Sequence, residues 1–167
     1  MTSVYTWAVL LRTFTSRLES EAEVAHACER VFAVVSDPDF ISRSTPFIRR
    51  VTDLGDGRWR WHVVDIPTPQ GSFGAVLTQR TELDPPQRVR FRHEPQGAEL
   101  AGADGTFTLT PVAAPDGPRT RLRIDMTVRA RVPAPRVTAP VVEQAMRGVL
   151  ALMRQRFVAA LTEELAD

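Results

Sequence analysis

Few side chains in this sequence are suited to acid–base, nucleophilic or metal chemistry. Three histidines, His26, His62 and His93, lie far apart and form no His-x-His or Glu-x-x-His pair, so their spacing does not favour a metal site. His26 and Cys28 could form a nucleophile pair, but no third residue that would orient them is evident. We therefore predict no metal site and no catalytic residue, with His93 as the one candidate for an acid or base.

The charged residues exclude several further classes of protein. All 21 basic residues are Arg, and without lysine there is neither Schiff-base chemistry nor the lysine of a phosphate-binding loop. Because 20 acidic residues leave a net charge of only +1, the composition does not indicate a nucleic-acid partner. The single cysteine allows no intrachain disulfide and fits a reducing compartment. We expect a cytoplasmic protein without cofactors that does not bind nucleic acid.

Alternation of apolar and polar residues with period two dominates the chain and predicts strands. The predicted strands are Phe14–Val24, Phe47–Asp53, Arg58–Asp65, Ser72–Leu83, Arg88–His93, Thr106–Pro111 and Arg119–Val132, with a loop at Pro67–Gly71. The segment Glu29–Ser36 suits a short helix, and Asp37 before Pro38 suits the start of a second one. Apolar residues spaced by three or four after Thr138, which we expect to be the cap, predict a final helix of about 25 residues.

The length of 167 residues fits one domain, which we place at residues 13–167 after an N-terminal extension at residues 1–12. No apolar run is long enough to cross a membrane, so we expect no stable membrane insertion. Strands followed by one long helix indicate an α+β fold, in which only that helix can cover the apolar face of an antiparallel sheet. Because a sheet of about seven strands curls, a single helix cannot fill its concave face, and we expect a cavity between them.

The candidates for binding a ligand in this cavity lie on the inner faces of the predicted strands and on the apolar stripe of the final helix. Trp59 and Trp61 offer flat surfaces, whereas Gln79, Thr81 and His93 offer polar groups. The complete set is Trp59, Trp61, Phe73, Gln79, Thr81, Phe91, His93, Phe107, Met126, Met146, Val149 and Met153. Each residue also has a purely structural interpretation, because large apolar side chains fill cores and buried polar groups bond to backbone or water.

Several segments together resemble a known superfamily. They are Cys28–Pro38 (CERVFAVVSDP), the hairpin Ile48–Gly57, Leu83–Val89 (LDPPQRV), Gly105–Leu109 (GTFTL), Thr120–Leu122 and the final helix. The chain resembles the START / birch-pollen-allergen helix-grip superfamily, also called the polyketide cyclase and lipid transport (SRPBCC) superfamily. Within it, the pattern is most similar to the carbon monoxide dehydrogenase G-like group.

The resemblance implies a curved antiparallel sheet wrapped on the last helix, with two short helices between the first and second strands. It implies an apolar pocket but no shared catalytic residue. It also makes the first and last strands neighbours, so that acidic residues of one face arginines of the other across the strands. The residues concerned are Glu19, Glu21 and Glu23 on the first strand and Arg121, Arg123 and Arg129 on the last.

We therefore predict an intracellular binding or carrier protein, rather than an enzyme, for a small hydrophobic or amphipathic molecule such as a lipid, a quinone or a polyketide-like compound. One alternative is a polyketide cyclase or dehydratase in which His93 is the acid or base, helped by Gln79 or Thr81. Another is a non-enzymatic assembly or interaction factor whose contact is an arginine-rich surface such as that of Arg88, Arg90 and Arg92. An edge strand or the segment Val4–Leu11 could also support a homodimer.

Overall fold

The computed structural model describes residues 11–68 and 71–167, except for the side chains of residues 65–68, 71 and 73. The elements are, in order, β1 (Leu11–Val24), α1 (Cys28–Val35), α2 (Pro38–Ser44), β2 (Ile48–Gly55), β3 (Arg58–Thr68), β4 (Gly71–Asp84), β5 (Arg88–His93), β6 (Ala101–Val112), β7 (Arg119–Pro133), the 3₁₀ turn η1 (Arg136–Thr138) and α3 (Ala139–Ala166). The extension predicted for residues 1–12 lies outside the described residues apart from its last two, which belong to β1. The predicted domain boundary therefore stays a prediction.

Seven antiparallel strands form one sheet in the order β1-β7-β6-β5-β4-β3-β2, which confirms the predicted α+β helix-grip architecture. β1 and β7 are paired from Leu11 opposite Pro133 to Val24 opposite Thr120, so the first and last strands are neighbours as expected. Opposite charges meet across them, with Nε of Arg121 and Oε1 of Glu21 forming an ion pair at 3.2 Å. Arg129 differs from the expectation, because it forms an ion pair with Asp104 on β6.

The β3–β4 hairpin is longer than the sequence pattern indicated. Pairing continues to Thr68 opposite Gly71, so Pro67 lies in a strand rather than in the predicted loop. β2 pairs with β3 only as far as Val63, opposite Ile48. Beyond that point no other strand in the described part of the chain pairs with the outer side of β3. A residue without an amide hydrogen is tolerated on such an edge.

β6 is also longer than predicted, because it starts at Ala101 and pairs with β7 along its whole length. The sequence pattern indicated that Gly102–Gly105 only leads up to a strand. In the structure both glycines permit close contact: a Cβ added at Gly102 would overlap the His93 ring, and one at Gly105 would lie 2.7 Å from the Phe91 ring. These glycines therefore accommodate aromatic neighbours within a continuous strand.

The helix starts follow the sequence in one case and depart from it in the other. Asp37 caps α2, its carboxylate accepting from the amide of Asp39 at 3.0 Å, as predicted. Thr138 precedes α3 but makes no side-chain cap, because the 3₁₀ turn η1 already gives it helical geometry and its hydroxyl donates back to the carbonyl of Pro135 at 2.8 Å.

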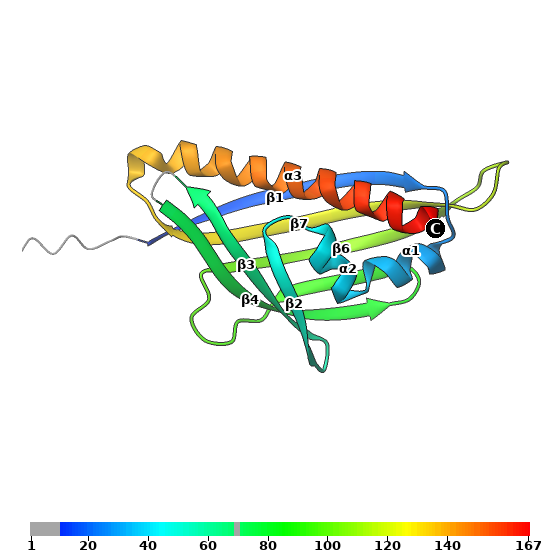
Figure 1. Ribbon diagram of the computed structural model, residues 1–167, viewed down its shortest axis with the longest axis horizontal. Helices are drawn as coiled ribbons and strands as arrows, with labels where there is room; N and C mark the ends of the chain where they lie inside the picture. The colour runs from blue at the N-terminus through cyan, green and yellow to red at the C-terminus, as the bar shows by residue number, and fades with distance from the viewer. Residues whose placement is uncertain (1–10, 69–70) are drawn as a thin grey trace, which may run out of the picture.

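The curvature of the sheet leaves only part of it under the long helix. In Figure 1, α3 runs along β1 and β7, whereas β2, β3 and β4 cross beneath at a steep angle and turn away from it. Register shifts in the β2–β3 and β3–β4 pairs add to this bend. None of the helices in the described part of the chain is long and apolar enough to cross a bilayer.

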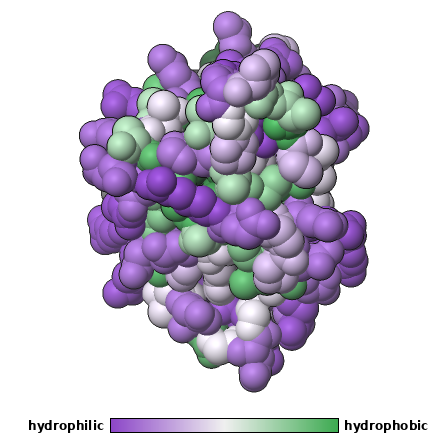
Figure 2. Space-filling model, turned by 90° about the vertical axis from the view of Figure 1, so that its right-hand side faces the viewer, coloured by the Kyte–Doolittle hydropathy of each residue, from purple (hydrophilic) through white to green (hydrophobic). Residues whose placement is uncertain are grey.

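The hydrophobic core is divided into two clusters along α3. The larger one lies where α1, α2 and the C-terminal half of α3 meet the sheet, and includes Val31, Phe40, Leu122, Leu161 and Leu165. The smaller one joins the N-terminal start of α3 to β1 and β7 through Phe14, Val132, Ala134 and Val142. Figure 2 views the end nearest the larger cluster, where hydrophilic side chains dominate and hydrophobic ones show only in small patches.

Candidate functional site

A cavity of about 220 Å³ separates the two clusters, between the middle of α3 and the concave face of the sheet. Five buried apolar residues that belong to neither cluster line it instead, namely Leu77, Phe91, Ala101, Ala103 and Leu150. They are shielded from solvent without packing into a continuous core. The sheet is thus wider than α3 can cover, and a cavity remains between the helix and the concave face of the sheet.

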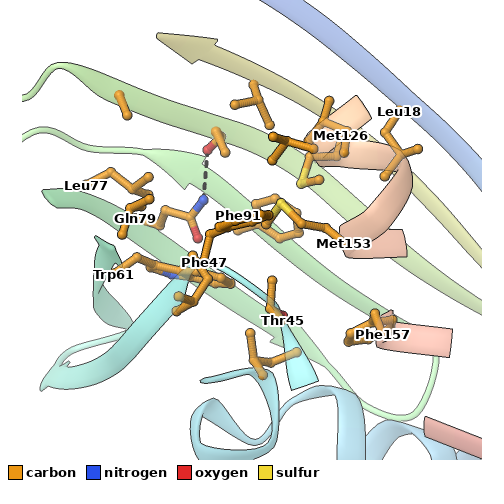
Figure 3. A pocket seen from close by; sticks show the side chains of 18 of the residues that line it. Leu18, Thr45, Phe47, Trp61, Leu77, Gln79, Phe91, Met126, Met153 and Phe157 are labelled. Carbon is orange, nitrogen blue, oxygen red and sulfur yellow. Dashed lines mark hydrogen bonds between the residues drawn. The ribbon is translucent and has the colours of Figure 1, made fainter. Parts of the chain in front are cut away.

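Most of the side chains singled out from the sequence meet around this cavity. Those that line it are Trp59, Trp61, Gln79, Thr81, Phe91, Phe107, Met126, Met146, Val149 and Met153. Figure 3 shows Trp61, Gln79 and Phe91 projecting from the sheet, with Met153 reaching in from α3. The side chain of Phe73 lies outside the described residues. That these residues bind a ligand is a prediction, whereas their common location is a feature of the fold.

His93 is not among the residues that line the cavity, although the alternation Val89, Phe91, His93 placed it on the inner face. β5 pairs with β6 only as far as Phe91 opposite Gly105. At the split beyond that pair, the His93 ring packs on Gly102 and its Nε2 lies 2.7 Å from Oε2 of Glu99. The periodicity rule fails here because the strand ends and the ladder opens.

Polar side chains replace the backbone hydrogen bonds that are lost where β5 leaves β6. The amide of His93 donates to Asp104 at 2.8 Å, and Nε2 of Gln79 donates to the backbone carbonyl of Ala103 at 3.0 Å. Glu99 accepts from the Thr78 amide at 2.9 Å and from the Thr78 hydroxyl at 2.6 Å. These bonds hold the wall of the cavity in place without filling the cavity.

The two carboxylates of this network are held in the ionised form. Burial by itself would raise the pKa of Glu99, but the hydrogen bonds from Thr78 and His93 outweigh burial and lower it below its ordinary value. For Asp104, burial acts in the same upward direction, and the Arg129 side chain with the His93 amide lowers the pKa overall. The charges of Glu99 and Asp104 therefore stabilise the wall of the cavity, and neither carboxylate lines its interior.

Three polar atoms of cavity-lining residues are buried and have no hydrogen-bond partner among the described residues. They are Nε1 of Trp61, Oε1 of Gln79 and Oγ1 of Thr81. Gln79 is only 2% exposed, so its side-chain oxygen is not solvated from outside. In Figure 3 this oxygen points toward the side of the cavity where Trp61 and Phe47 lie. A buried polar group left without a partner costs roughly 1–3 kcal/mol, which gives these atoms an affinity for a polar ligand atom or water.

Several lining residues carried little or no signal in the sequence. Phe47 and Thr45 come from the link between α2 and β2, and Leu18 comes from β1. Phe47 was predicted to start a strand, but its backbone has φ 68°, an unusual conformation for a large residue, and the strand begins at Ile48. Of these three residues, only Leu18 could have been found, because its alternation with polar neighbours placed it on the inner face.

The charged groups near the cavity do not form acid–base machinery. The only ionisable side chains among the described lining residues are Arg129, which is paired with Asp104, and the exposed Arg154. Within residues 11–68 and 71–167, no group of three or more His, Cys, Asp or Glu could hold a metal ion. Cys28 is buried at the start of α1, where its sulfur lies 3.3 Å from the Thr120 hydroxyl.

A curved antiparallel sheet that grips one C-terminal helix across an apolar cavity defines a protein of the START-like helix-grip class. Residues 15–166 match the model of the family described as polyketide cyclase / dehydrase and lipid transport, and the chain belongs to this family. No curated protein matches the sequence. The comparisons do not bear on the carbon monoxide dehydrogenase G-like group, so that closer resemblance stays a prediction.

Solved structures share the fold at low sequence identity. A conserved protein from Geobacillus kaustophilus has a TM-score of 0.64 and 17% identity, over 90% of this chain and 95% of that one. The Zhui aromatase/cyclase from Streptomyces sp. R1128 has a TM-score of 0.64 and 17% identity, over 90% and 93%. A START superfamily protein from Mycobacterium smegmatis has a TM-score of 0.60 and 19% identity, over 89% and 95%. These likenesses establish the fold, and the family supports a ligand-binding or cyclase-like role.

Proposed function

We propose that this protein binds and carries a small hydrophobic or amphipathic molecule in the cavity under α3. The observation that supports this most strongly is the unfilled space between two packed clusters, lined almost wholly by apolar side chains. Burying a ligand there gains about 25 cal/mol per Å² of apolar surface, before the costs of ordering are subtracted. At about 220 Å³, the cavity is smaller than the roughly 300–1,000 Å³ of drug-sized sites, which favours a compact ligand.

Two measurements test the proposal. Native mass spectrometry of the freshly purified protein should show an added mass from a retained apolar molecule. Titration with fatty acids, isoprenoid quinones and flavonoids should quench tryptophan fluorescence, because Trp59 and Trp61 both line the cavity. If the spectra show only the bare chain and no compound in the panel binds, the carrier function is wrong.

A matched pair of variants links binding to the cavity. Ala103 is buried and lines the cavity, so Ala103→Leu should fill part of it and weaken binding at least tenfold. Ala151→Leu makes the same change at an exposed position on α3 that does not line the cavity, and should leave affinity unchanged. Equal effects of the two variants would place the ligand elsewhere on the molecule.

A cyclase-like enzyme is the second candidate, and the family match favours it. Such an enzyme needs a group that accepts a proton within reach of the bound substrate. His93 bonds to Glu99 outside the lining, and the described lining residues include no His, Asp or Glu. Conversion of a reactive polyketide-like substrate by the wild-type protein, abolished by Thr81→Val, would favour the enzyme over the carrier. A rate equal to that of buffer alone would remove this candidate.

A further inference from the structure

The unpartnered atoms of the cavity specify more than a hydrophobic ligand. Gln79 lies opposite Trp59 in the β3–β4 register, which makes it a diagonal neighbour of Trp61 on the same inner face. Diagonal neighbours in antiparallel pairs are within reach of long and aromatic side chains. One polar atom of a ligand at this place can therefore contact both Gln79 and Trp61.

The chemical role of each atom is fixed by its surroundings. Because Nε2 of Gln79 already donates to the carbonyl of Ala103, flipping the amide would set two oxygens against each other. The free atom is thus Oε1, which only accepts, while Nε1 of Trp61 only donates. A complementary ligand atom must donate one hydrogen bond and accept another.

We propose that the ligand presents an uncharged hydroxyl group, on a compact aromatic framework, to Gln79 and Trp61. This inference rests on the proposed binding function. A hydroxyl donates to Oε1 of Gln79 and accepts from Nε1 of Trp61. Of these two side chains, a ketone or an ether satisfies Trp61 and leaves the Gln79 oxygen without a donor, and a carboxylate places negative charge beside that oxygen. The carboxylate also lacks an unpaired cation inside the cavity, because Arg129 is bound to Asp104 and Arg154 is exposed.

The aromatic framework of the proposed ligand is inferred from the side chains that line the cavity. Trp59, Trp61, Phe91 and Phe107 give the sheet side of the cavity flat, rigid surfaces, and Met126 and Met153 can adjust around a planar ring system. The volume of about 220 Å³ suits a molecule of two fused rings better than a long acyl chain.

Three naphthalenes of similar size separate the alternatives by isothermal titration calorimetry at pH 7. 2-Naphthol can donate and accept, 2-methoxynaphthalene can only accept, and 2-naphthoate is charged. The wild-type protein should bind naphthol about tenfold or more tighter than the methyl ether, and naphthoate more weakly than either. In Gln79→Met, the preference for naphthol over the ether should fall to within about threefold, because the acceptor is gone.

Two further variants protect this result against a simple loss of structure. Gln79→Met also removes the donor to Ala103, so Trp61→Phe serves as the second variant. It removes the indole N–H, keeps a smaller aromatic ring, and should weaken naphthol by about tenfold. Gln155→Met makes the same exchange at an exposed position of α3 and should leave both affinities unchanged.

The outcomes separate this inference from the proposed function. Equal affinities of naphthol and its ether would mean that water satisfies the polar atoms, and would overturn the hydroxyl assignment while leaving the carrier function intact. Tightest binding of naphthoate, or binding of quinones or fatty acids without binding of naphthol, would also overturn it. If no naphthalene and no member of the wider panel binds, the proposed function itself fails.

Discussion

The two halves of α3 have similar apolar stripes but different surroundings. The C-terminal end packs solidly: Leu161 and Leu165 are each 1% exposed. Phe157, one turn before Leu161, still borders the cavity, but its ring meets that of Phe40 with centroids 5.7 Å apart. In the middle of the helix, Met146, Val149 and Met153 are half-buried and face the cavity. A helical stripe alone therefore does not decide whether a region is core or binding site. The decisive factor is whether the curved sheet and the short helices α1 and α2 supply packing partners.

The largest expected effect comes from the same substitution made in each region. Leu161→Ala removes a side chain enclosed on all sides, and should lower the free energy of unfolding by about 4 kcal/mol. Leu150→Ala should cost only about 2 kcal/mol, because Leu150 is also buried, at 5% exposed, but already borders empty space. Urea denaturation of both variants measures the difference. Equal losses would mean that the cavity is closed in solution.

The wall beside the cavity depends on hydrogen bonds, so it should respond to pH where the packed half does not. Because the pKa of Glu99 is lowered in the folded state, its ionised form stabilises the fold above the ordinary pKa, and this contribution disappears as pH falls through the folded value. Glu99→Gln should cost about 1–2 kcal/mol at pH 7, since an amide nitrogen would face one of the donors. The cost should shrink below about pH 4.

Denaturation curves of wild type and Glu99→Gln between pH 3 and pH 7 provide this measurement. Leu161→Ala is the control, because its cost should not vary with pH. A constant difference between wild type and Glu99→Gln across that range would show that the carboxylate charge does not hold the wall.

Much of the difference between the packed end of α3 and its cavity-facing middle could be anticipated from the sequence, because it follows from period-two alternation and one long helical stripe. The space beneath α3 is a consequence of covering a wide, twisted sheet with a single helix, whereas the pairing of the first and last strands was implied by the family resemblance. The lining residues on strand centres, such as Trp61 and Gln79, were therefore found by parity alone.

The remainder depends on contacts between distant segments. His93 was misplaced because the β5–β6 ladder ends two residues before it, and Glu99, its partner, lies in a segment without periodicity. Phe47 lines the cavity through a left-handed backbone conformation that no local pattern announces. The length of β6 was underestimated because its glycines resemble a break, although they make room for the rings of Phe91 and His93.

The smallest expected effect is a gain of stability on the cavity-facing half of α3. Gly148 lies inside α3, and the structure shows open space where a side chain at this position would be. Gly148→Ala should therefore raise the free energy of unfolding by about 0.5–1 kcal/mol through helix propensity. A thermal melt measures the shift. A loss of stability would mean that this part of the helix approaches another surface in solution.

The central claim is that an unfilled apolar space lies beneath the middle of α3, and xenon tests it without assuming any natural ligand. Xenon enters dry apolar cavities and gives strong density in crystals pressurised with the gas. We expect a xenon site between Met153 of α3 and the sheet residues Phe91 and Met126. No xenon there, with the Trp61 and Met153 side chains meeting across the space, would contradict the account.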